Sequence, residues 1–308
     1  MNLSWSDRSQ KSRIIFVAAI VFLIVLNLYT FIAAYPETYR IDSGIGSGPV
    51  LAKDFSAYYI GAWRLFNDPS KVYVHGNVSD GEPPIYPQPE AYKYLPSFLV
   101  LVSPLIFLSY QQALITFDVF QFALLPLMAL LLYKLLNKKG LWLTLAVAVI
   151  VLLLPFPLPK CGVSASYFWQ WGEGQAKVFE TFLLLLAFYL GSSERPYLSG
   201  LAFALAAFDP RFGLLSLPLF VWYNRKRLKA SLGSMVVCLI VSNVALLTPA
   251  VGSSFLNMAV GSGASTPVYY YAYIPLLTIV SFIVVNLKDI VMAISHSIST
   301  RHALQSNS

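Results

Sequence analysis

The sequence predicts an all-α protein, a polytopic bundle of about eight transmembrane helices. Three observations predict it. The chain is 57% hydrophobic and only 11% charged, whereas soluble domains carry about 25% charged residues. Long apolar runs recur from residue 14 to the polar C-terminal tail, with no stretch left for a soluble domain, so residues 1–308 form one integral membrane domain. The cations behind the +7 net charge cluster in short loops beside these runs, which indicates membrane topology and not a nucleic-acid partner.

The spans follow from the length of the apolar runs, because a helix needs roughly 20 residues to cross a bilayer. The clear candidates are 14–34, 112–134, 141–158, 176–191, 231–249 and 268–287. The first run follows Arg8, Lys11 and Arg13 and exceeds the apolar core of about 7–15 residues in a secretory signal. We therefore interpret it as a retained signal-anchor.

Two further apolar segments are ambiguous. Segment 95–108 contains Pro96 and Pro104 and is too short to cross, so it predicts an interfacial or re-entrant helix in the first outer loop. Segment 197–223 is interrupted by Asp209, Pro210 and Arg211, and is either one span or a hairpin of two short helices. A hairpin keeps the basic loop 225–229 in the cytoplasm, as the positive-inside rule favours. It also leaves both termini, including the tail 288–308, cytoplasmic.

This topology places four polar segments on the outer side: a helix beginning near Asp54, the proline-rich stretch 81–96, the loop 159–177 and the turn at Asp209. In the first of these, apolar and aromatic residues recur at helical spacing, which predicts an amphipathic interfacial helix lying flat on the membrane. Asp54 takes the N-cap position. Arg64 is expected to contact lipid headgroups.

The order of these motifs resembles a known family. The segment DFSAYYIGAWRLF is followed by Asp68, Pro69 and Tyr73, then by YLPSFLVLVSPL, the motif GEGQAKV, and RPYLSGLAFALAA before a charged turn and a basic loop. Together they resemble the polyprenol-phosphate-mannose-dependent mannosyltransferases of the integral-membrane glycosyltransferase superfamily C. The resemblance covers about residues 14–230, which makes 1–230 the glycosyltransferase-like core and 231–287 two C-terminal spans. The chain departs from the family in having fewer spans after the basic loop, and in Asp209, Pro210 and Arg211 where members often have Lys-Pro.

The resemblance implies a hexosyltransferase that moves mannose from a polyprenyl-phosphate carrier to a lipid or glycan acceptor on the outer face of the plasma membrane. Such a transfer needs one carboxylate as general base, because the departing phosphate monoester, with a second pKa of about 6, leaves without an acid. A single base opposite the leaving group implies inversion. The resemblance aligns Asp54 with the catalytic acid of the family. No cofactor is expected, and His75, His296 and His302 are too scattered for a metal site.

Six residues are candidates for binding the donor phosphate or sugar: Arg211, Lys53, Gln175, Glu173, Lys93 and Tyr94. Arg211 suits bidentate phosphate contact, although it could instead be a turn cation held by Asp209. Gln175 matches the Gly-Gln motif of the family. Glu173 is spaced with Lys177 and Glu180 along one helix face, and these three could equally shield one another where the helix enters lipid.

Two other classes of function stay open. Broken helices and buried charges also mark lipid or glycan transporters, although we find no similar halves, and the polar groups gather at one face instead of mid-membrane. A non-catalytic membrane subunit is the second alternative, because few spans follow the basic loop.

Overall fold

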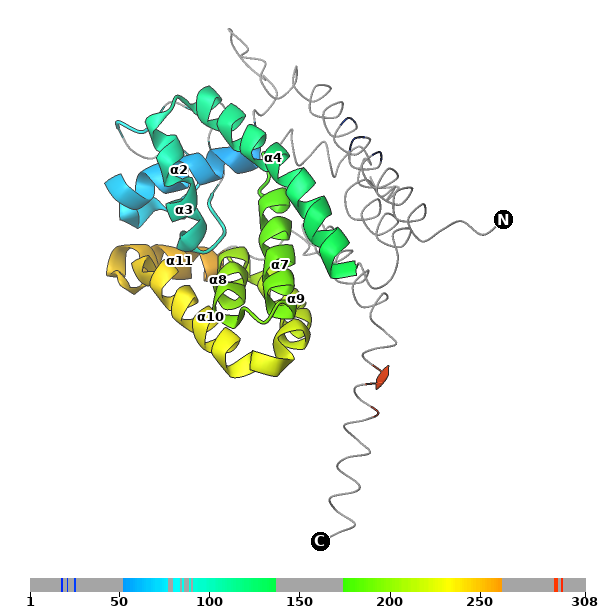
Figure 1. The fold of residues 1–308 in the computed structure, drawn as a ribbon. Coiled ribbons are helices and arrows are strands. Elements are labelled where there is room, and N and C mark those ends of the chain that lie inside the picture. Colours follow the sequence, from blue (N-terminus) through cyan, green and yellow to red (C-terminus); the bar gives the residue numbers. More distant parts are fainter. Residues whose placement is uncertain are drawn as a thin grey trace, which may run out of the picture.

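A computed structural model describes residues 52–76, 80–83, 85, 89, 91–136 and 174–261, and the single positions 18, 21, 25, 291, 292 and 295. In this part of the chain every regular element is a helix and no strand occurs, which confirms the all-α prediction. Figure 1 shows two neighbouring groups, α2 to α4 and α7 to α10, and places α11 next to the first group, below α3.

The first group is built around a buried helix, α2 (Lys53–Asn67). It packs against α3 (Pro96–Val102), η2 (Ser103–Phe107) and the start of α4 (Tyr110–Leu136), with η1 (Pro69–Lys71) after its C-terminus. The aromatic stripe of α2 faces other aromatic rings, as in the pair Phe55–Phe117 at 5.1 Å between centroids and Tyr58–Phe98 at 5.0 Å. The prediction that the apolar face of α2 rests on a membrane surface is therefore wrong, because protein covers that face.

The second group contains the predicted hairpin. After α7 (Lys177–Ser192), α8 (Pro196–Ala206) and α9 (Pro210–Asn224) replace a single span, with the turn at residues 207–209. Pro210 cannot continue a helix from α8 but suits the first position of α9, since it lacks an N–H. The rings of Phe203 and Phe220 lie 4.3 Å apart between the two arms. The hairpin interpretation is confirmed.

After η4 (Arg225–Arg227), helix α10 (Leu228–Ser242) packs closely on α8. A Cβ added at Gly200 would lie 2.3 Å from the carbonyl oxygen of Ser231, so only glycine permits this approach. Helix α10 stops before Asn243, whose side-chain oxygen accepts a hydrogen bond from the N–H of Ser97 in α3 at 3.0 Å. The predicted continuous span 231–249 is thus broken, and η5 (Val244–Leu247) and α11 (Pro249–Gly261) follow.

Among the described residues one helix is long and apolar enough to cross a membrane, at Tyr110–Leu135. It matches the predicted span 112–134. Segments 96–107 and 196–206 form shorter apolar helices, as expected for the short segment of the first outer loop and for one arm of the hairpin. Of the other predicted spans, 141–158 and 268–287 lie outside the described residues, as does nearly all of 14–34. The count of eight spans stays a prediction.

Basic residues from distant loops gather at one end of the bundle. Lys226 Nζ lies 2.6 Å from Glu194 Oε1, which joins the α7–α8 loop to the start of η4. The ammonium of Lys134, near the end of α4, lies 5.2 Å from the ring centroid of Tyr189. Because helices α7 to α10 alternate in direction, the turn at Asp209 lies at the opposite end.

Candidate active site

The loop before α7 runs directly against the first turn of α2. Gly174 has φ = +65°, and a Cβ built there would lie 2.5 Å from Cβ of Phe55 and 3.2 Å from Cβ of Ala52. Glycine alone fits both the backbone conformation and the space. The side chain of Gln121, buried in α4, donates to the carbonyl oxygen of Gln175 at 2.9 Å. The Gly-Gln motif is therefore fixed beside the helix that carries Asp54.

The start of α7 is joined to the α8–α9 turn by a buried ion cluster. Lys177 Nζ lies 3.1 Å from Glu180 Oε2 and 3.3 Å from Asp209 Oδ2. Lys177 is 5% exposed and both acids are 0% exposed. One ammonium thus contacts two carboxyl groups, of which Glu180 belongs to its own helix and Asp209 to the turn 32 residues away.

The same turn is held to the segment before α3. The N–H of Leu95 donates to the carbonyl oxygen of Phe208 at 2.9 Å. The ring of Phe208 stacks on Phe98 at 4.3 Å and meets Tyr94 edge-on at 5.8 Å. Together with the contact of Gly174 with α2, these contacts bring all four segments that were expected to converge into contact in their described parts.

Tyr94 links this cluster to Asp54. The Lys177 ammonium lies 5.8 Å from the Tyr94 ring centroid, and Tyr94 is hydrogen-bonded to Tyr58 on α2. Burial raises the pKa of Tyr58 well above its usual value, with further contributions from the electrostatic effects of Tyr94 and of Asp54 one turn earlier. The Tyr58 phenol is hence neutral at physiological pH. Polar groups extend from Asp54 through Tyr58 and Tyr94 to Lys177.

The structure places the predicted site residues at positions of differing burial. Asp54 is half-buried in the first turn of α2, but Ala52 is the N-cap residue, so the N-cap prediction is wrong. Tyr94 is buried, Gln175 half-buried and Lys93 exposed. Arg211 is the second residue of α9 and Lys53 the first of α2; their side chains, and the whole of Glu173, lie outside the described part.

Sequence reasoning missed the role of Tyr58 and the pairing of Lys177 with Asp209. Tyr58 belonged to an aromatic stripe whose spacing predicts packing alone. The spacing of Lys177 and Glu180 indicated a local pair, but the third member comes from a distant turn. Asp118 is fully buried in α4. Within the described ranges no three His, Cys, Asp or Glu side chains group closely enough to hold a metal ion.

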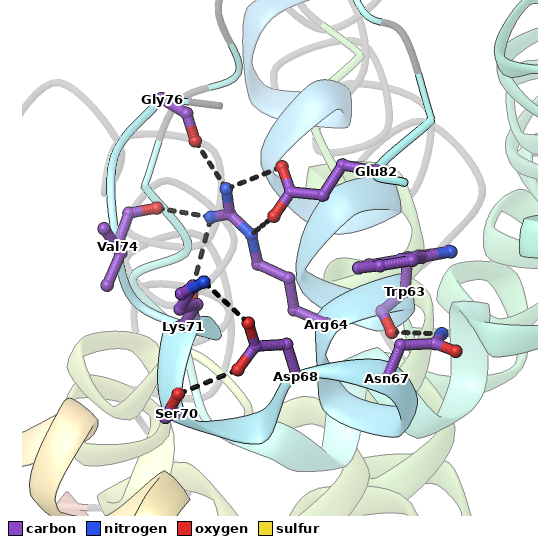
Figure 2. Close-up of polar contacts among 9 residues, drawn as sticks. All are labelled: Trp63, Arg64, Asn67, Asp68, Ser70, Lys71, Val74, Gly76 and Glu82. Carbon is purple, nitrogen blue, oxygen red and sulfur yellow. Dashed lines mark hydrogen bonds and ion pairs between the residues drawn. The ribbon is translucent and has the colours of Figure 1, made fainter. Parts of the chain in front are cut away.

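Arg64 forms a second buried ion cluster, on the last turns of α2 (Figure 2). It contacts Glu82 through two nitrogens, at 2.8 and 3.0 Å. Its remaining N–H groups donate to the carbonyl oxygens of Lys71 at 3.3 Å, of Val74 at 2.5 Å, and of Gly76. All five guanidinium N–H groups are used. Arg64 is 1% exposed, so the expected contact with lipid headgroups is wrong.

Comparison with known families gives a match to glycosyltransferase family 87 over residues 92–284, which is more than half of the chain. The protein belongs to glycosyltransferase family 87. No curated protein and no solved structure matches it. The family 87 match contains Tyr94, Lys177 and Asp209, whereas Asp54 precedes it. Membership makes this protein a sugar transferase, which uses a sugar donor and an acceptor, in agreement with the class of function expected from the sequence.

Proposed function

We propose that this protein transfers mannose from a polyprenyl-phosphate carrier to a lipid or glycan acceptor, with inversion at the anomeric carbon. One observation carries the proposal. In a family 87 protein, a half-buried carboxylate at the start of α2 lies beside the Gly-Gln loop and, through Tyr58 and Tyr94, beside the turn that precedes Arg211. A base and the backbone of a candidate phosphate ligand therefore lie at one end of the bundle.

Asp54 would act as the general base that accepts the proton of the acceptor hydroxyl as that oxygen attacks the anomeric carbon. It lies in the first turn of α2, where the positive end of the helix dipole attracts negative charge. The phosphate leaves as a monoester dianion or monoanion and needs no acid. Arg211, Lys53 and Lys93 are the cations proposed to stabilise it, and Gln175 and Glu173 are proposed to bind the sugar.

The direct test of the activity is transfer of radiolabelled mannose from polyprenyl-phosphate-mannose to a lipid and glycan extract by the purified protein. Asp54→Asn should lower turnover by about 10²-fold or more, the usual contribution of a positioned base. Stability should change by less than about 1 kcal/mol, because the amide keeps the shape and hydrogen-bonding oxygen. Asp80→Asn, at an exposed position in the same loop region, is the matched control and should leave turnover unchanged. Unchanged turnover in Asp54→Asn would remove this residue from the mechanism.

The phosphate ligand is tested separately. Arg211→Ala should weaken donor binding or turnover by about 2–4 kcal/mol, the scale of losing one charge-stabilising contact. Arg211→Lys should recover only part of the lost donor binding or turnover, because an ammonium cannot make the bidentate contact. Unchanged donor use in Arg211→Ala, with its loss in Lys53→Ala or Lys93→Ala, would place the phosphate elsewhere.

We further propose a multi-pass plasma-membrane location, with both termini cytoplasmic and the active site outside. The apolar helix α4 and the basic end opposite the turn at Asp209 support this placement. In a background lacking native cysteines, Ser79→Cys should react with an impermeant thiol reagent from outside, and Ser193→Cys only from inside. The reverse pattern would place the site on the cytoplasmic face.

A further inference from the structure

The buried cluster around Lys177 is the feature of this site that the proposed mechanism does not use. Its three charged groups are almost wholly buried, and one ammonium serves two carboxyl groups. A cation that only needed neutralising within α7 would be satisfied by Glu180, three residues along the same helix. The contact with Asp209 provides a link that Glu180 cannot, because it joins α7 to the α8–α9 turn.

Asp209 stands immediately before α9, and Arg211 is the second residue of that helix. The N–H of Gly213 donates to the carbonyl oxygen of Asp209 at 3.2 Å, so the backbone of Asp209 also closes the first turn of α9. Holding the Asp209 side chain therefore holds the first turn of α9 relative to α7. Lys177 is two residues from Gln175, and its ammonium lies 5.8 Å from the Tyr94 ring centroid, so the ion pair lies next to two candidate donor-binding residues.

We propose that the Lys177–Asp209 ion pair is a positioning device: it fixes the start of α9, and with it Arg211, at the place where the donor phosphate binds. This inference rests on the proposed function, since it concerns how the donor end of that site is ordered. Lys177 is not itself a ligand of the donor phosphate, because its ammonium is already neutralised by two carboxyl groups that would repel the anion.

The two carboxyl groups supply a matched pair of variants. Asp209→Asn and Glu180→Gln each replace a fully buried carboxylate beside the Lys177 ammonium with a neutral amide of the same shape. Only Asp209 belongs to the turn. Binding of polyprenyl phosphate, measured by titration in detergent, should weaken about tenfold or more in Asp209→Asn and less than about twofold in Glu180→Gln. Asp209→Glu should recover part of the loss.

A double-mutant cycle tests whether the effect acts through Arg211. In an Arg211→Ala background, Asp209→Asn should weaken polyprenyl-phosphate binding by less than about twofold, because the residue that it positions is gone. Equal losses in the two carboxyl variants, or full additivity with Arg211→Ala, would overturn the proposal and leave the cluster with a purely structural role.

Amide hydrogen exchange separates this inference from the proposed function. Exchange at residues 207–213 should be faster in Asp209→Asn than in the wild type or in Glu180→Gln, with or without any ligand. If the wild type fails to bind polyprenyl phosphate, the proposed function is wrong, and the exchange data still decide whether the ion pair orders the turn. Unchanged exchange in Asp209→Asn would overturn the proposal by itself.

Discussion

The protein contains two buried ion clusters. Each pairs a buried cation with a buried acid, but the two differ in the number of acids per cation. Arg64 and Glu82 form a one-to-one pair, and backbone carbonyl oxygens take the remaining donors of the arginine. Lys177 instead lies between two carboxyl groups, so this cluster contains one cation and two acids. The first arrangement closes a loop onto its own helix, whereas the second joins elements that carry candidate site residues. We therefore infer that Arg64 stabilises the fold, whereas Lys177 orders the proposed site.

The Arg64 cluster should give the largest effect on stability. Arg64→Met leaves Glu82 buried without its cation, which should lower the free energy of unfolding by about 3–5 kcal/mol. The double variant Arg64→Met with Glu82→Gln should recover less than half of this loss, because the carbonyl oxygens of residues 71, 74 and 76 still lack donors. Unfolding by SDS titration in mixed micelles measures both. Recovery to the wild-type value would show that the carbonyl contacts contribute nothing.

The Lys177 cluster should differ from the Arg64 cluster in how much stability returns when its acids are also neutralised. Lys177→Met should cost about 3 kcal/mol, the lower end for a broken buried ion pair, because two adjacent buried carboxyl groups can share a proton. Neutralising all three positions, as Lys177→Met, Glu180→Gln and Asp209→Asn together, should recover most of that stability while donor binding stays weak. A triple variant as unstable as Lys177→Met, or one with wild-type donor binding, would contradict the distinction between the two clusters.

The two clusters also show how far the sequence leads. Apolar run length predicted α4, and the tripeptide at residues 209–211 predicted the hairpin, because a proline and two charges interrupt an apolar run visibly. Neither cluster was predictable. The partners of Arg64 are largely backbone carbonyl oxygens, which every residue carries, and Asp209 is separated from Lys177 by 32 residues.

The misread helix α2 has a related cause. An aromatic stripe at helical spacing suits lipid and a protein interior equally well, so the sequence indicates that Phe55 and Tyr58 are covered but not what covers them. The break of α10 at Asn243 was missed because apolar residues continue beyond it, at 244–247. At the site, the amphipathic segment and the family resemblance predict Asp54, the resemblance predicts Gln175, and the start of the predicted re-entrant helix predicts Tyr94. Tyr58 is recognisable only through its hydrogen bond with Tyr94.

A substitution at Gly174 should have an intermediate effect on the free energy of unfolding. It tests the contact between α2 and the loop before α7, in which neither ion cluster takes part. Gly174→Ala adds a Cβ 2.5 Å from that of Phe55 at a backbone φ of +65°. The strain should lower the free energy of unfolding by about 1–3 kcal/mol, and turnover should fall because the Gly-Gln loop moves away from Asp54. Gly81→Ala is the control, since it also has positive φ (+91°) but meets no atom within 4 Å. Equal turnover in the two variants would show that the position of the Gly-Gln loop does not affect catalysis.

The smallest effect should come from the exposed ion pair of Glu194 and Lys226, which contrasts with both buried clusters. The hydrogen bond from Lys226, and then its charge, lower the pKa of Glu194 from its ordinary value of 4.5. A carboxyl group whose pKa is lower in the folded state stabilises the protein above its unfolded pKa, and this contribution disappears as the pH falls through the folded pKa. The Tm difference between wild type and Lys226→Ala should therefore be small at pH 7, weaker in high salt, and absent at acid pH below the folded pKa of Glu194. Lys229→Ala removes the same charge from an exposed position three residues away, at the start of α10, and controls for net charge. A Tm difference that persists at low pH would mean that Lys226 acts through its stem packing and not through Glu194.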